Sequence, residues 1–189
     1  MSATNRGRKR NDSDFYKTPG YAIEVFLRNY RLESDGLTIL DPCAGSGTIA
    51  KAVKKFYPKA IINQCEIRED QPLIRYEGGW NFRGNALDLN SVDIVDVGVI
   101  ISNPPYSMAQ EIIEHFFKIK RPTAQVIMLL RIGFLESQKR IPFWKKYPVS
   151  ELYPLSHRPS FTGDGHTDAT AYAWFVWNNS DRQVIKVIS

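Results

Sequence analysis

Apolar side chains along the chain follow two alternating patterns. Over residues 19–31 they recur three and four positions apart behind a Thr18-Pro19 start, which is the spacing of a helix with one buried face. Residues 37–40 form a continuous apolar run, which is typical of a short buried strand. The same two patterns continue and predict helices at 19–31, 49–57, 108–118 and 135–144, and strands at 37–40, 60–65, 95–101 and 124–130.

The last third of the chain changes character. Aromatic and β-branched residues separated by loops predict strands at 151–153, 171–177 and 184–188, and the aromatic side chains of 171–177 are predicted to be core. Alternating strand and helix units followed by a strand-rich end predict an α/β fold. Its sheet would be mostly parallel, with helices on both faces and an antiparallel C-terminal hairpin. Residues 67–81 show no clear pattern beyond a loop at Gly78-Gly79.

Length and composition narrow the kinds of protein that this chain can be. Its 189 residues suit one domain with a single core, expected at 15–189, and its net charge of +5 fits a polyanionic partner. The first 14 residues are polar and basic, so we expect a flexible tail at 1–14 and no signal peptide. No apolar run approaches the ~20 residues that a membrane span needs. Two cysteines in apolar contexts, Cys43 and Cys65, predict a reduced, cytoplasmic setting.

A glycine-rich turn joins the first predicted strand to the helix after it. It reads Asp41-Pro42-Cys43-Ala44-Gly45-Ser46-Gly47, and its glycines let the backbone approach a ligand closely. Because the turn opens a helix, its N–H groups would face that ligand. The Gly-Lys-Ser/Thr ending of a phosphate-binding loop is missing, since Thr48 follows Gly47 directly. The acidic residue at the strand end, Asp41, suits a cationic group instead.

Polar residues stand at or just after the predicted strand ends. They are Asp41, Glu66, Asn85 and Asn103. Ligands of open α/β sheets bind at the carboxyl ends of strands, so we expect these four side chains to converge on one site. Glu66 is placed to bind ribose hydroxyls in the way that dinucleotide-binding folds do, and an ordinary solvated carboxylate is the alternative.

The tetrapeptide Asn103-Pro104-Pro105-Tyr106 follows the third predicted strand, about sixty residues after the glycine turn. The Asn103 amide oxygen and the Pro104 carbonyl can each accept one N–H bond from a planar NH2 group. Such bonds favour a pyramidal, nucleophilic nitrogen and stabilise the positive charge that develops on it. Tyr106 offers a ring face for a base swung out of its stack. A plain strand-ending turn would explain the same residues without any chemistry.

Together the two motifs resemble the S-adenosylmethionine-dependent amino-methyltransferases, and residues 131–144, 156–161 and 171–177 look like those of the small phage- and prophage-type DNA adenine-N6 methylases. The resemblance implies a Rossmann-like class I methyltransferase fold with a seven-stranded sheet and S-adenosylmethionine as cofactor. It implies catalytic roles for Asn103, Pro104, Pro105 and Tyr106. Residues 15–19 are similar to the motif that closes over the methionine end of the cofactor. The implied cofactor-binding residues are Tyr16, Lys17, Thr18, Asp41, Pro42, Cys43, Ala44, Gly45, Ser46, Gly47, Glu66, Ile67, Asn85 and Ala86. Asn85 departs from the pattern, because the family often has aspartate there.

The resemblance extends over residues 131–144, 156–161 and 171–177 and implies DNA as the partner. The residues expected to contact it are Arg131, Arg158, Phe161 and His166, through phosphate contacts and stacking. Histidines and aspartates between 157 and 168 match no metal-site spacing, so no metal is predicted. Since the chain has no room for a separate target-recognition domain, sequence selectivity would be relaxed or would depend on a homodimer or a separate specificity partner.

Four alternatives stay open. The same Asn-Pro pair can grip the N4 amine of cytosine, although Ser-Pro is more usual there and Asn103 favours adenine. RNA adenine methyltransferases and the glutamine methyltransferases of release factors commonly carry an added domain that is absent here. A catalytically dead nucleic-acid-binding module is the fourth alternative, and the intact Asp41, Asn103 and Tyr106 argue against it. The DNA methylase interpretation expects the cytoplasm of a bacterium or a phage-infected host.

Overall fold

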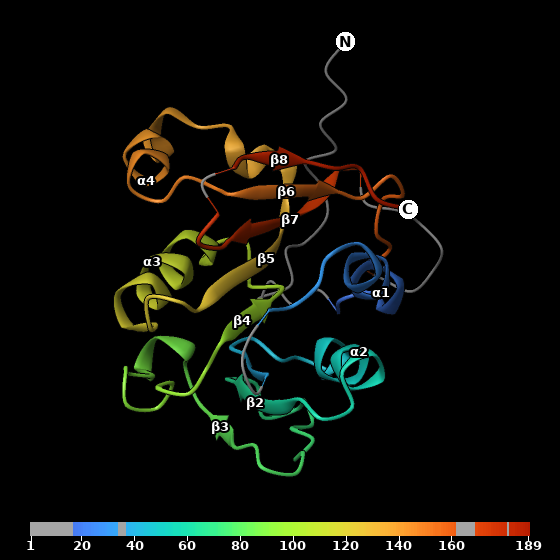
Figure 1. Ribbon diagram of the computed structural model, residues 1–189, viewed down its shortest axis with the longest axis vertical. Helices are drawn as coiled ribbons and strands as arrows, with labels where there is room; N and C mark the ends of the chain where they lie inside the picture. Colours follow the sequence, from blue (N-terminus) through green and yellow to red (C-terminus); the bar gives the residue numbers. More distant parts are fainter. Residues whose placement is uncertain (1–16, 34–36, 162–168, 181) are drawn as a thin grey trace.

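The computed structural model describes residues 17–33, 37–161, 169–180 and 182–189, which form an eight-stranded sheet with helices on both faces (Figure 1). The strands are β1 (Thr38–Asp41), β2 (Ile61–Glu66), β3 (Asn81–Arg83), β4 (Val99–Ser102), β5 (Gln125–Arg131), β6 (Glu151–Pro154), β7 (Tyr172–Trp177) and β8 (Val184–Ile185). The α-helices are α1 (Gly20–Asn29), α2 (Thr48–Phe56), α3 (Ala109–Ile119) and α4 (Ile141–Lys146), and the 3₁₀ helices are η1 (Ala86–Asp88), η2 (Ile132–Leu135) and η3 (Gln138–Arg140).

The strand order is β3-β2-β1-β4-β5-β7-β6-β8. The pairs β3–β2, β2–β1, β1–β4, β4–β5 and β6–β8 are parallel, whereas β7 runs antiparallel to both β5 and β6. This confirms the predicted α/β fold, with its mostly parallel sheet and antiparallel C-terminal hairpin. The order changes direction at β1, whose neighbours are β2 and β4, and a sheet of this kind binds ligands at such a point.

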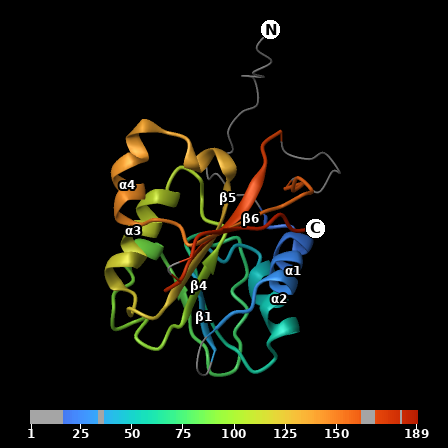
Figure 2. The same ribbon diagram turned by 45° about the horizontal axis from the view of Figure 1, so that its top comes forward.

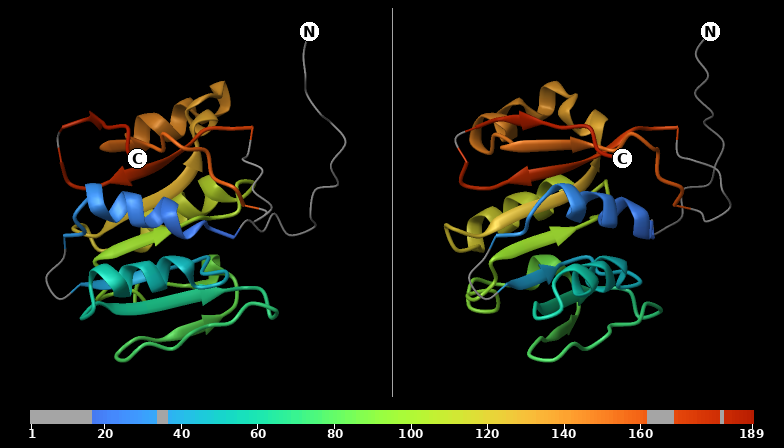
Figure 3. Two further views of the ribbon diagram at one scale, coloured as in Figure 1. Left: turned by 90° about the vertical axis from the view of Figure 1, so that its right-hand side faces the viewer. Right: turned by 45° about the vertical axis from the view of Figure 1, so that its right-hand side comes forward.

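Two apolar layers cover the two faces of the sheet. Successive strand residues point to opposite sides, so Ile101 packs in the layer under α1 and α2, while Ile100 packs in the layer that contains α3 and α4. Figures 2 and 3 show the same division, with α1 and α2 lying across one face and α3 and α4 on the other. Residues of β7 are buried throughout, which confirms the predicted core role of Tyr172, Trp174, Phe175 and Trp177.

Four predictions about elements differ from the structure. The strand predicted at 184–188 is shorter, because β8 ends at Ile185 and Ile188 makes only an isolated bridge to Leu155. The expected count of seven strands is one too few, because the three-residue β3 begins at Asn81, the last residue of the segment 67–81, and no strand is predicted there. The predicted strand at 95–101 begins only at Val99, where pairing with β1 begins, and Val95 is exposed. The predicted helix at 135–144 is divided into η2, η3 and α4. Ser137 has an extended φ and its Oγ accepts from Lys139 N, and Pro142 stands at the start of α4.

Within the part of the chain that the structure covers, no helix is long and apolar enough to cross a membrane.

Candidate functional site

The two sequence motifs meet at the carboxyl ends of β1 and β4. These strands are neighbours, with Leu40 paired to Ile100, so the residues that end them lie side by side. Ser102 ends β4, and its hydroxyl donates to Oδ1 of Asp41, the last residue of β1, at 2.7 Å. The glycine turn and the Asn-Pro-Pro-Tyr segment are therefore joined by one buried hydrogen bond.

Asp41 is a buried carboxylate with unused hydrogen-bonding capacity. Its side chain is 1% exposed, and Oδ1 accepts from Ser102 Oγ and from Cys43 N. Oδ2 is also buried and has no hydrogen-bond partner among the residues that the structure describes. Burial raises the pKa of Asp41 to about 7, against the opposing effect of its two hydrogen bonds. An added cation would favour the charged form of this carboxylate.

Glu66 holds the glycine turn against β2. Its Oε2 accepts from Gly45 N at 2.6 Å and its Oε1 accepts from Arg68 N at 2.8 Å, while the residue as a whole is 5% exposed. Gly45 and Gly47 have φ of 51° and 71°, a backbone conformation that residues with a Cβ rarely adopt. The turn therefore needs glycine at these two positions, and its shape is fixed by the acidic residue that ends the next strand.

The Asn103 side chain is hydrogen-bonded to the segment that precedes α1. Its Nδ2 donates to Oγ1 of Thr18 at 3.1 Å, across 85 positions of the chain, and Thr18 is itself 9% exposed. On the other side of the amide, the Tyr106 hydroxyl approaches Asn103 Oδ1 at 3.5 Å. The predicted catalytic segment and the segment before the first helix thus lie together.

Aromatic side chains and one guanidinium surround Tyr106. Arg131, at the end of β5, places its Cζ 4.6 Å from the centroid of the Tyr106 ring, and its Nε donates to the Tyr172 hydroxyl at 3.0 Å. The Tyr106 and Tyr172 rings are 5.7 Å apart, and Phe161 meets Tyr172 edge-on at 4.9 Å. Arg131 and Phe161, both predicted to contact nucleic acid, are therefore beside the predicted catalytic motif.

The remaining predicted site residues are spread over the same edge. Ile67 is 63% exposed just after Glu66, whereas Ala86 is buried. Asn85 Oδ1 accepts from Leu87 N, so this side chain begins η1. Lys17 and Arg158 are exposed. Predictions for Tyr16 and His166, and for the basic tail, lie outside the described residues.

Sequence reasoning missed two members of this site. Ser102 is not among the predicted site residues, although its place between the predicted strand and Asn103 indicates that it lies at the strand end. Tyr172 is predicted to be core and is fully buried, but its hydroxyl accepts a hydrogen bond from Arg131 Nε at the edge of the sheet. Its position as the first residue of an antiparallel strand indicates that role.

The two cysteines are free thiols close to this site. Burial raises the pKa of Cys65 to about 12, and burial together with the nearby Asp41 carboxylate raises that of Cys43. Both thiols therefore stay protonated and unreactive at neutral pH. Among the described residues, no group of three or more His, Cys, Asp or Glu side chains could hold a metal ion.

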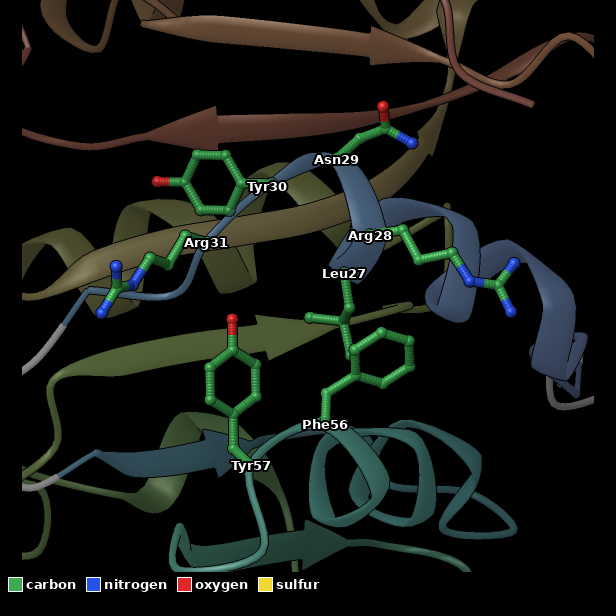
Figure 4. Close-up of a pocket in the computed structure, with 7 residues that line it drawn as sticks. All are labelled: Leu27, Arg28, Asn29, Tyr30, Arg31, Phe56 and Tyr57. Atoms are coloured by element: carbon green, nitrogen blue, oxygen red, sulfur yellow. The ribbon is translucent and has the colours of Figure 1, made fainter.

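A surface pocket of about 390 Å³ lies at the far ends of α1 and α2, away from the glycine turn (Figure 4). Three of its polar side chains have hydrogen-bond or ion-pair partners within the protein. Tyr57 OH accepts from Leu32 N, Asn29 donates to the Val25 carbonyl and Arg28 pairs with Glu24. The pocket is lined by Leu27, Arg28, Asn29, Tyr30, Arg31, Phe56 and Tyr57, none of which belongs to the predicted site.

Comparison with known proteins finds neither a matching family model nor a matching curated protein. Solved structures do match. The methyltransferase subunit of a type I restriction-modification system from Streptococcus thermophilus superposes with a TM-score of 0.67 at 13% identity, over 90% of this chain and 46% of that one. The M protein of the type I restriction enzyme EcoKI gives 0.62 at 13% identity, over 90% and 45%. An RNA methyltransferase from Salinibacter ruber, in complex with S-adenosyl-L-homocysteine, gives 0.54 at 14% identity, over 88% and 95%.

The chain therefore has the Rossmann-like fold of methyltransferases, as the sequence analysis expected. It spans less than half the length of the two restriction-system proteins. Since a restriction-system subunit and an RNA methyltransferase both share the fold, the fold does not define the methyl acceptor.

The polar groups at the carboxyl edge fit S-adenosylmethionine. Oδ2 of Asp41, which has no partner among the described residues, is an acceptor suited to a cationic group, and S-adenosylmethionine carries a sulfonium and an ammonium. The glycine turn brings bare backbone to the same edge. Each oxygen of Glu66 keeps a second lone pair that could accept from a hydroxyl.

Proposed function

We propose that this chain transfers a methyl group from S-adenosylmethionine to the exocyclic N6 amine of adenine in DNA. The position of Asn103 carries the proposal. Asn103 follows directly after Ser102, whose hydroxyl donates to Asp41. The Asn103 amide oxygen, which would accept from the amine, therefore lies close to the Asp41 carboxylate, which would bind the cationic methyl donor. The fold of the chain, shared with methyltransferases, supports the same assignment.

S-adenosylmethionine would supply an electrophilic methyl group on its sulfonium. Asp41 would face its cationic end and Glu66 its ribose, while the turn between them would lie against it through backbone atoms. Lys17, Ile67, Asn85 and Ala86 would complete the surroundings. In this scheme Glu66 has two functions, because it shapes the turn as well as binding a hydroxyl.

The acceptor amine would lie against Asn103 Oδ1 and the Pro104 carbonyl, which accept its two N–H bonds. A base carrying that amine needs aromatic surface once it has left its stack, and the half-buried Tyr106 and Phe161 offer it. Arg131 and the exposed Arg158 would attract backbone phosphate. The Asn-Pro pair could also grip the amine of cytosine, RNA adenine or glutamine, and these alternatives differ from DNA adenine in what carries the amine.

The test is transfer of labelled methyl from S-adenosylmethionine to unmethylated duplex DNA. We expect turnover by the wild-type chain, and loss of at least a hundredfold in Asn103→Ala, in line with removal of one transition-state acceptor. The exposed Asn179→Ala serves as the matched control and should keep wild-type turnover. Calorimetry should give the same S-adenosylmethionine affinity for Asn103→Ala and wild type.

Two results would overturn the proposal. If wild type and Asn103→Ala labelled DNA equally, the transfer would not depend on this site. If the wild-type chain bound no S-adenosylmethionine, the catalytically dead module would be the better assignment.

A further inference from the structure

We propose that Thr18 is a positioning residue that anchors the Asn103 amide in the orientation seen here, with Nδ2 toward Thr18 and Oδ1 toward the Tyr106 side. The inference rests on the proposed function, and it gives Thr18 a role distinct from contact with the cofactor. It starts from the hydrogen bond in which Asn103 Nδ2 donates to Thr18 Oγ1 at 3.1 Å. With the nitrogen end committed to Thr18, the amide turns Oδ1 toward the Tyr106 side.

The orientation matters because an amide has two unlike ends. Oδ1 accepts hydrogen bonds, whereas Nδ2 only donates them. An amine that must become nucleophilic needs an acceptor on its N–H. A half-turn of the Asn103 amide would offer it a donor instead, and the two donors would repel. One side-chain torsion of Asn103 therefore separates a productive site from an unproductive one.

Thr18 is well suited to hold that torsion because its own position is fixed. It precedes Pro19, whose ring restricts φ and whose carbonyl accepts from Ala22 N at 3.1 Å in the first turn of α1. The Ala22 carbonyl in turn accepts from Trp174 Nε1 at 2.9 Å, and Trp174 is fully buried in β7. The start of α1 is thus attached to the sheet, and the 9% exposure of Thr18 limits competition from water.

Two substitutions separate the hydroxyl from the packing of Thr18. Thr18→Val keeps the shape and removes the oxygen, whereas Thr18→Ser keeps the oxygen and removes the methyl. We expect Thr18→Val to lower kcat by about tenfold to a hundredfold, with the KM and the dissociation constant for S-adenosylmethionine within threefold of wild type. Thr18→Ser should recover most of the lost kcat. The exposed Thr123→Val is the matched control for loss of a threonine hydroxyl.

A readout independent of turnover is the side-chain NH2 signal of Asn103 in protein labelled with ¹⁵N-asparagine, assigned by its loss in Asn103→Ala. In wild type and Thr18→Ser, one NH2 proton should be protected from exchange. In Thr18→Val the signal should shift and the protection should be lost.

The outcomes are distinct. Loss of kcat in Thr18→Val with recovery in Thr18→Ser supports the inference. Unchanged kcat in Thr18→Val, or an Asn103 NH2 signal that ignores this substitution, overturns it. Raised KM for S-adenosylmethionine with unchanged kcat also overturns it and would assign Thr18 to cofactor contact. If wild type methylates no DNA while the NMR signal responds as expected, the proposed function fails and the orienting contact stands.

Discussion

At the scale of single residues, Asp41 combines burial with a carboxylate oxygen that no described residue pairs. Burial of a charge costs free energy unless partners compensate it, and here Ser102 and Cys43 serve only one of the two oxygens. The raised pKa of about 7 records that cost. Binding groups that await a charged ligand often show such a shift.

The pH dependence of folding tests this account of Asp41. The pKa rises from 3.8 in the unfolded chain to about 7 in the folded one, so the stabilisation that this group gives at low pH is lost as pH rises from 3.8 to about 7. Asp41→Asn has no such titration. Measured by urea unfolding at several pH values, the unfolding free energy of the variant should rise by roughly 2–4 kcal/mol relative to that of wild type between pH 4 and pH 8. A stability difference that stays constant over this range would contradict the raised pKa.

Glu66 allows a second test at this scale. Its two oxygens each accept one backbone N–H, whereas the amide of Glu66→Gln would place its own NH2 against one of these donors. We expect a loss of about 1–3 kcal/mol in unfolding free energy, together with weaker S-adenosylmethionine binding by calorimetry. Glu69→Gln, three residues on and exposed, should change neither quantity. Equal behaviour of the two variants would remove Glu66 from the site.

At the scale of elements, the short β3 depends on a close approach between two segments of backbone. A Cβ added at Gly79 would lie 2.0 Å from the carbonyl oxygen of Ile62 in β2. We expect Gly79→Ala to cost about 1–3 kcal/mol of unfolding free energy, because backbone must move to accept it. A Cβ at Gly20, the first residue of α1, would meet nothing within 4 Å, so Gly20→Ala should keep or raise stability. Equal destabilisation by the two substitutions would contradict this packing.

Much of the element order follows from periodicity, and the exceptions have physical causes. The helices α1, α2 and α3 lie close to their predicted bounds, because each has one clear buried face, and β1, β2 and β5 do so because each is a nearly continuous buried run. β3 is too short to show a pattern, and tertiary pairing with β2 creates it. The segment after β5 reads as one amphipathic helix, yet local bonds at Ser137 and the ring of Pro142 divide it. Short-range polar contacts of this kind leave no periodic signal.

At the scale of the whole molecule, the site is a product of topology. Asp41 and Asn103 are distant in sequence and adjacent in space, because β4 pairs directly with β1. The sequence identifies these residues through the rule that ligands bind at strand ends, and the structure brings them together as that rule requires. The sequence alone could not reveal the hydrogen-bond partners of Ser102, Thr18 and Tyr172, since these depend on which strands are neighbours and on where α1 begins.

The chain has the fold of methyltransferases, and the proposed function assigns the choice of acceptor to a few side chains at one edge of the sheet. The measurement that tests the central claim most directly is mass spectrometry of the wild-type reaction with labelled S-adenosylmethionine. Unmethylated duplex DNA, RNA and protein would be offered side by side. The account predicts N6-methyladenine in the DNA digest as the main labelled product. Label confined to RNA or protein, or to cytosine in the DNA, would contradict it.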